Sequence, residues 1–171
     1  MFNKIRSAST IVLFLLFTAC SKDNATGEVT TNYLTVKVDG KEKNFSDVRG
    51  RWVDGGNFLE ITASNSGDEW LTFTVMSNST RVSAGQYSLD DASGFTLIST
   101  YSPDKNKPAL NYAATRGTLA LEDAFALDIK TINNSTVNGS FNGVLVRVEG
   151  ATTLGQVTLT DGKFNTAIVP N

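Results

Sequence analysis

Apolar and polar residues alternate along most of the chain from Tyr33 onward, with a repeat of two residues. Such alternation is typical of β-strands that bury one face, because successive side chains in a strand point to opposite sides. No window of 12 residues carries the apolar stripe of an amphipathic α-helix. Clusters of Gly, Asn and Asp interrupt the alternation at the spacing expected of short antiparallel strands. The pattern predicts an all-β domain with no helix longer than a turn or two.

The alternation also predicts which side chains face the core. The Asp39-Gly40 and Asp161-Gly162 steps each predict a hairpin turn, and Glu122-Asp123 predicts a third. Asn142-Gly143 shifts the phase of its strand, which predicts a β-bulge. The expected inward sets are Leu34, Val36 and Val38; Leu59, Ile61 and Ala63; Leu71, Phe73 and Val75; and Phe125, Leu127 and Ile129.

Eight to ten strands are expected within residues 33–171, which are long enough for one domain with a substantial core. We expect a single antiparallel β-sandwich of two sheets. The alternative is a meander-type β-barrel, because consecutive hairpins suit both arrangements.

The N-terminus differs from the rest of the chain. Lys4 and Arg6 precede an apolar run of nine residues, 11–19, that ends in a small residue. This run is shorter than the roughly 20 residues that a transmembrane helix needs. A basic start, a short apolar segment and a small final residue are typical of a secretory signal peptide. Residues 1–19 are therefore predicted to be removed.

Cys20, the sole cysteine of the chain, follows this run directly. The stretch Leu16–Cys20 resembles the lipobox of bacterial lipoproteins, although Phe17 stands where Leu is usual. The resemblance implies that Cys20 carries diacylglycerol and acyl chains such as palmitate after cleavage by signal peptidase II. The alternative is an ordinary secreted protein with a stray cysteine in its leader. Residues 20–32, lipidated at Cys20, are small and polar and predict a flexible tether.

Five short motifs of the domain are VKVDGK (36–41), GQYSL (85–89), GTLAL (117–121), VNGSF (137–141) and VTLTDGKF (157–164). In these motifs the domain resembles a group of small Bacteroidota lipoproteins of uncharacterised function. Ser140, where Thr is expected, and Asn44, where an aromatic residue is common, depart from their pattern. The resemblance implies a lipid-anchored protein of the cell envelope, at the outer membrane, on either its periplasmic or its surface face.

Composition excludes several kinds of chemistry. The chain has no histidine, so it lacks the commonest general base near neutral pH and the commonest neutral metal ligand. Acylation of Cys20 would leave no thiol nucleophile. Without the leader, acidic residues outnumber basic ones by four, which gives no electrostatic footprint for nucleic acid. We expect no cofactor, no metal site and no nucleic-acid partner.

Aromatic residues are the best candidates for a binding surface. Trp70 alternates out of phase with the apolar set of its strand, and Trp52 follows a Gly-Arg step. Together with Tyr101, and with Tyr87 and Tyr112, they could form a platform for a glycan or another envelope protein. The alternative is that the indoles fill the core, as most Trp side chains do.

Paired acids define the alternative function. Asp68-Glu69, Asp90-Asp91 and Glu122-Asp123 are adjacent in sequence, but neighbouring strand residues point to opposite faces. A glycosidase needs two carboxyls about 5–10 Å apart. DDASG (90–94) and SNSGDE (64–69) offer oxygen ligands for calcium without the spacing of an EF-hand loop. We expect a non-enzymatic binding or structural module; the alternatives are a histidine-free glycan hydrolase that uses carboxylates and a glycan-binding accessory protein.

Overall fold

The structure is a computed structural model that describes residues 31–66, 68–89, 92–115 and 122–169. The predicted leader 1–19, Cys20, most of the tether, Asp90-Asp91 and the strand expected at 117–121 lie outside these ranges. The hairpin predicted at Glu122-Asp123 depends on that strand, so it also lies outside them.

Eleven strands and two short 3₁₀ turns, at Asp54–Gly56 and Pro108–Leu110, make up the regular structure of the described part. β8, which the alternation did not predict, takes the number of strands above the expected range. The strands are β1 (Tyr33–Val38), β2 (Lys41–Phe45), β3 (Asp47–Val53), β4 (Phe58–Ser64), β5 (Trp70–Ser77), β6 (Gly85–Ser88), β7 (Phe95–Ser102), β8 (Tyr112–Thr115), β9 (Ala124–Ile132), β10 (Thr136–Glu149) and β11 (Thr152–Val169).

Hydrogen bonds join all eleven strands into one sheet, in the order β2-β1-β11-β3-β4-β5-β7-β8-β10-β9-β6. All neighbours are antiparallel except β3 and β11, which run parallel over two residue pairs. β10 and β11 also pair with each other, so the pairing closes a circuit that runs through β3, β4, β5, β7 and β8. The all-β class, with a mostly antiparallel sheet, is confirmed.

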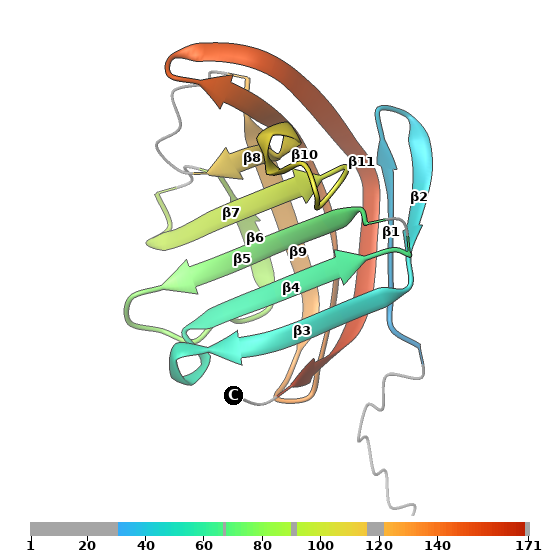
Figure 1. Ribbon diagram of the computed structural model, residues 1–171. Helices are drawn as coiled ribbons and strands as arrows, with labels where there is room; N and C mark the ends of the chain where they lie inside the picture. The colour runs from blue at the N-terminus through green and yellow to red at the C-terminus, as the bar shows by residue number, and fades with distance from the viewer. Residues whose placement is uncertain (1–30, 67, 90–91, 116–121, 170–171) are drawn as a thin grey trace, which may run out of the picture.

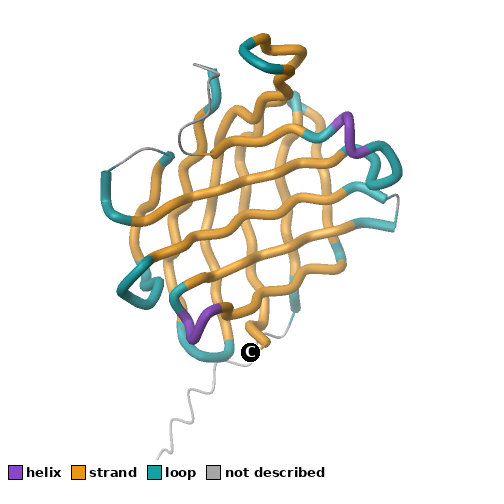
Figure 2. Tube along the Cα trace, turned by 60° about the vertical axis from the view of Figure 1, so that its left-hand side comes forward, coloured by secondary structure: helices purple, strands orange, loops and turns teal. Residues whose placement is uncertain are grey.

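The sheet folds over so that two layers of strands face each other (Figure 1). β3, β4, β5 and β7 lie in one layer, and β9, β10 and β11 lie in the other. The strands of one layer cross those of the other when the molecule is viewed through both (Figure 2). None of the strands that the structure describes covers the outer face of the β3–β5 layer.

The core lies between the layers. All four predicted inward sets are buried, with side chains at most 6% exposed. Four phenylalanines meet at the centre: Phe73 of β5 lies 6.0 Å from Phe125 of β9, 5.2 Å from Phe141 of β10 and 5.2 Å from Phe164 of β11, between ring centroids. Such aromatic contacts add about 0.5–1.5 kcal/mol per pair beyond the burial of area. The cluster ties the two layers together.

Glycines in the long strands make room for these rings. A Cβ atom on Gly139 would lie 2.2 Å from the Asp128 carbonyl oxygen and 2.8 Å from Cζ of Phe164. A Cβ atom on Gly162 would lie 2.7 Å from the Phe141 ring. These phenylalanines pack against the bare backbone of the neighbouring strand.

Of the two Asp-Gly steps predicted to form hairpins, the first, Asp39-Gly40, forms the turn. Asp39 and Gly40 both have positive φ, 49° and 77°, and connect β1 to β2 as a two-residue hairpin. Positive φ at both central residues is what a type I′ turn requires.

The second Asp-Gly prediction is wrong, because β11 runs unbroken through Asp161 and Gly162. Asp161 alone has positive φ, 56°, which does not reverse the chain. β11 is instead held on both sides, by β1 and by β10, and its extra residues are absorbed as irregularities in both pairings. One of these lies between Phe141 and Gly143, but the extra residue there belongs to β11. β10 itself pairs with β9 through Asn142 and Gly143 without a shift, so the bulge predicted in this strand is not found.

Candidate binding groove

The outer face of β3 and β4 is built by the same alternation that buries their inner face. In β3, Asp47, Arg49 and Arg51 are exposed, whereas Val48 and Trp52 are buried. β4 presents Glu60, Thr62 and Ser64 outward and buries the apolar residues between them. Polar side chains therefore gather on one side of the layer.

Strand register sets these side chains in rows. Asp47 pairs with Ser64, which pairs with Trp70 at the start of β5. A second row holds Arg49 and Thr62, and a third holds Arg51 and Glu60. Rows are two residues apart, so the first and third are separated by about 13 Å at a rise of roughly 3.3 Å per residue.

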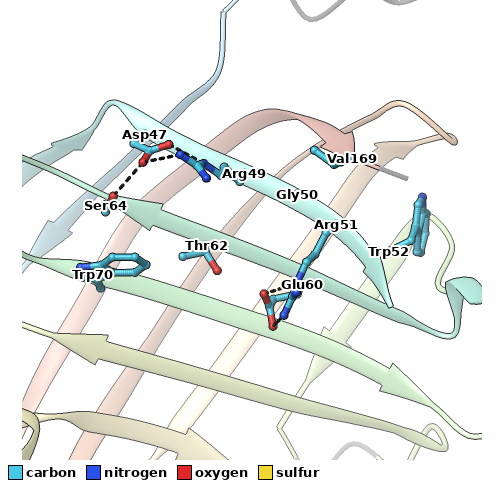
Figure 3. Close-up of a pocket in the computed structure, with 10 residues that line it drawn as sticks. All are labelled: Asp47, Arg49, Gly50, Arg51, Trp52, Glu60, Thr62, Ser64, Trp70 and Val169. Carbon is cyan, nitrogen blue, oxygen red and sulfur yellow. Dashed lines mark hydrogen bonds and ion pairs between the residues drawn. The ribbon is translucent and has the colours of Figure 1, made fainter. Parts of the chain in front are cut away.

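These rows enclose a groove of about 530 Å³ on the outer face. Figure 3 shows Thr62 on its floor, with the Trp70 indole to one side and the Arg51–Glu60 pair to the other. The backbone of Gly50 and the end of β11, at Val169, complete one edge. A volume of this order lies within the range of small-molecule sites in proteins.

Two arginine–carboxylate pairs border the groove, and both are bidentate. Arg51 donates from Nε and Nη2 to the two oxygens of Glu60, at 2.7 and 3.1 Å. This hydrogen bonding, with the attraction of the negative charge, raises the pKa of Arg51 further above its ordinary range. Arg49 donates likewise to the two oxygens of Asp47, at 3.0 and 3.3 Å. The pairs fix the orientation of four charged side chains.

Trp70 is the exposed aromatic of the groove. Trp70 is 38% exposed, as its phase in the alternation predicted. Its cross-strand neighbours on the two sides are Ser64 and Ser102, both small, so neither covers the ring. An indole held at the end of a paired strand, with one side free, offers a flat apolar surface in a polar setting.

The other predicted aromatics are buried, although Trp52 also lines the groove. Trp52 is 6% exposed and Tyr101 is 4% exposed, so these two and Trp70 do not form one exposed platform. The guanidinium of Arg81 stacks on the Trp52 ring, with its carbon 4.2 Å from the centroid. Tyr87 is also buried, and its hydroxyl donates to the Ser83 carbonyl at 2.7 Å. For Trp52, the alternative of a core position is what the structure shows, and Tyr101 is buried as well.

Tyr101 belongs instead to a buried polar cluster around Glu69. The carboxylate of Glu69 accepts hydrogen bonds from the Tyr101 hydroxyl and from Asn65 Nδ2, the latter at 2.6 Å, and Lys43 Nζ lies 3.1 Å away. Burial alone would raise the pKa of Glu69, but these three donors together hold it below its ordinary value. Burial and the bond to Glu69 raise the pKa of Tyr101. The cluster links β2 and β7 to the loop between β4 and β5.

The paired acids do not assemble a hydrolytic site in the described residues. Asp68 contacts Lys105 and Asn106 in an exposed loop, whereas its neighbour Glu69 is buried. Asp47 and Glu60 do share the groove, but they lie in different rows, and each carboxylate is bound by its own arginine. Among the residues that the structure describes, no three His, Cys, Asp or Glu side chains gather as metal ligands.

Sequence reasoning missed the four charged residues of the groove, Asp47, Arg49, Arg51 and Glu60. Their outward phase was readable, because Arg49 and Arg51 alternate with buried residues. Their pairing was not, because it depends on the register between β3 and β4.

Comparison with known proteins gives no relative to guide the interpretation. No family model, no curated protein and no solved structure matches the chain. Within the described ranges, no helix has the length and apolar character needed to cross a membrane.

Proposed function

We propose that this chain is a lipid-anchored protein of the cell envelope, of the kind found as small lipoproteins in Bacteroidota, and that it binds a glycan without cleaving it. Cys20 is the site of lipidation, the outer membrane is the location, and residues 20–32 are the tether. The β-domain is the binding module, and the groove over β3–β5 is its site.

The observation that carries the binding role is the exposed Trp70 beside a row of hydrogen-bonding side chains. Sugar rings present C–H groups on their faces and hydroxyls at their edges. The indole face can stack on the C–H groups. The side chains of Thr62, Ser64 and the two ion pairs can form hydrogen bonds with the hydroxyls. These groups lie on paired strands of a packed layer, so little conformational entropy is lost on binding.

Replacing Trp70 by Ala tests this role. The full chain, purified in a detergent without a sugar headgroup, is run in native gels that contain dextran, laminarin, mannan or xyloglucan. At least one polymer should retard the wild-type protein, and Trp70→Ala should lose most of that retardation, because stacking on an aromatic ring is lost.

Tyr33→Ala is the matched control, because Tyr33 is similarly exposed, at 41%, but lies on β1 and does not line the groove. It should be retarded like the wild type. Equal retardation of Trp70→Ala and wild type would place binding elsewhere, and the absence of retardation by any of the polymers would reject glycan binding.

The lipid anchor is tested on the native protein by intact-mass measurement. The mass should equal residues 20–171 plus a diacylglycerol and its acyl chains, and the protein should partition into the detergent phase. Cys20→Ser should keep the leader and lose the added mass, because the thiol that accepts the lipid is gone. An unmodified wild-type polypeptide would refute the anchor without affecting the proposal for the groove.

A further inference from the structure

We infer that the glycan bound in the groove is uncharged. This inference rests on the proposed function and narrows its ligand. Among the lining residues, two positive side chains, Arg49 and Arg51, are matched by two negative ones, Asp47 and Glu60. Each guanidinium is already bound by a carboxylate of the same groove, so the walls offer no unmatched charge.

The hydrogen-bonding capacity that remains in the groove is of mixed kind. A guanidinium has five N–H donors, and Arg51 uses two of them on Glu60. The Glu60 oxygens each keep a further lone pair. Arg49 likewise uses two of its donors on Asp47. One Asp47 oxygen also accepts a hydrogen bond from the Ser64 hydroxyl at 3.4 Å. Donors and acceptors thus lie side by side at both ends of the groove.

A hydroxyl group is both a hydrogen-bond donor and an acceptor, so it can bind at either end of the groove by donating or by accepting. A carboxylate or sulfate only accepts. To bind an arginine here, it would have to displace Glu60 or Asp47 from a bidentate pair, or lie against the negative charge of these groups. The geometry therefore favours a neutral polyhydroxylated chain and disfavours an anionic one.

The test compares each neutral polymer with its carboxymethylated form, which keeps the backbone and adds charge. The full-length protein should bind the neutral form at least about tenfold more tightly, or about 1.4 kcal/mol. Its affinity for the neutral form should change little between low and high salt, because no net charge is being paired.

Glu60→Gln supplies the diagnostic variant, because it frees Arg51 for an anion while keeping the shape of the side chain. The preference for the neutral form should fall by about tenfold. Asp47→Asn, which frees Arg49, should act in the same direction. Asp161→Asn is the matched control, because it releases Lys37 from an ion pair of 2.8 Å that lies outside the groove, and it should leave the preference unchanged.

The outcomes separate the two proposals. If wild-type protein binds the carboxymethylated form as tightly as the neutral form, or more tightly, and Trp70→Ala abolishes this binding, the inference is overturned and glycan binding stands. If neither form binds, the proposed function fails and the inference fails with it.

Discussion

Gly139→Ala is expected to lower the free energy of unfolding by about 3 kcal/mol, at the upper end of what overpacking costs. The added methyl would lie 2.2 Å from the Asp128 carbonyl oxygen, a backbone atom of the paired strand β9. It would also meet the ring of Phe164, which is itself held in the central aromatic cluster. Neither neighbour can move without displacing a paired strand. The midpoint and slope of urea unfolding measure the effect.

Gly155→Ala is the matched control in the same pair of long strands. A Cβ atom there would lie 3.6 Å from its nearest neighbour, a ring carbon of Tyr112, which is ordinary contact. This substitution should be neutral or slightly stabilising, because Ala loses less backbone freedom than Gly on folding. Similar losses of stability in both variants would mean that Gly139 is needed for reasons other than the close approach of β9 and Phe164.

Tyr101→Phe is expected to lower the free energy of unfolding by about 1.5–3 kcal/mol at neutral pH, the range for a hydrogen bond to a charged group. Removing the hydroxyl leaves Glu69 buried with one fewer donor, and only Lys43 and Asn65 remain of the three described above. The same unfolding experiment measures this loss.

The pH dependence of the free energy of unfolding shows whether the hydrogen bond from Tyr101 to Glu69 is responsible for this loss. The folded-state pKa of Glu69 lies below its ordinary 4.5, so this group stabilises the fold above pH 4.5, and the contribution is lost as the pH falls further. The folded-state pKa of Tyr101 lies above its ordinary 10.0, so its contribution is present below pH 10 and is lost as the pH rises beyond that. Tyr101→Phe should flatten the alkaline decline and make the acid decline shallower. An unchanged alkaline limb would show that the phenol does not titrate with folding.

The inward faces of the strands could be predicted from the sequence because burial imposes a repeat of two. Leu71, Phe73 and Val75 had to share a face once Trp70 and Thr72 were placed on the other. The same logic placed Trp70 outside. The position of Trp52 was left open, although it has the phase of buried Val48 and the opposite phase to Arg49 and Arg51.

The failure at Asp161-Gly162 has a physical cause. An Asp-Gly step favours a turn only when the strands on either side are free to pair with each other. Here β1 and β10 already pair with β11 on its two sides, and this tertiary pairing outweighs the local preference. The groove was unpredictable for a related reason, because Arg51 and Glu60 are nine residues apart and meet only through the register of β3 with β4.

The central place of β11 has a consequence for how the chain reaches its folded state. This strand follows, in the sequence, every strand with which it pairs. Leu34 of β1 pairs with Phe164 of β11, so nearly the whole described sequence lies between these two partners. Partners this distant in sequence form slowly, because closing the intervening loop costs entropy before any contact repays it. The circuit of paired strands therefore cannot close until β11 has been synthesised, although the hairpins of β1 with β2 and of β3 with β4 do not need it.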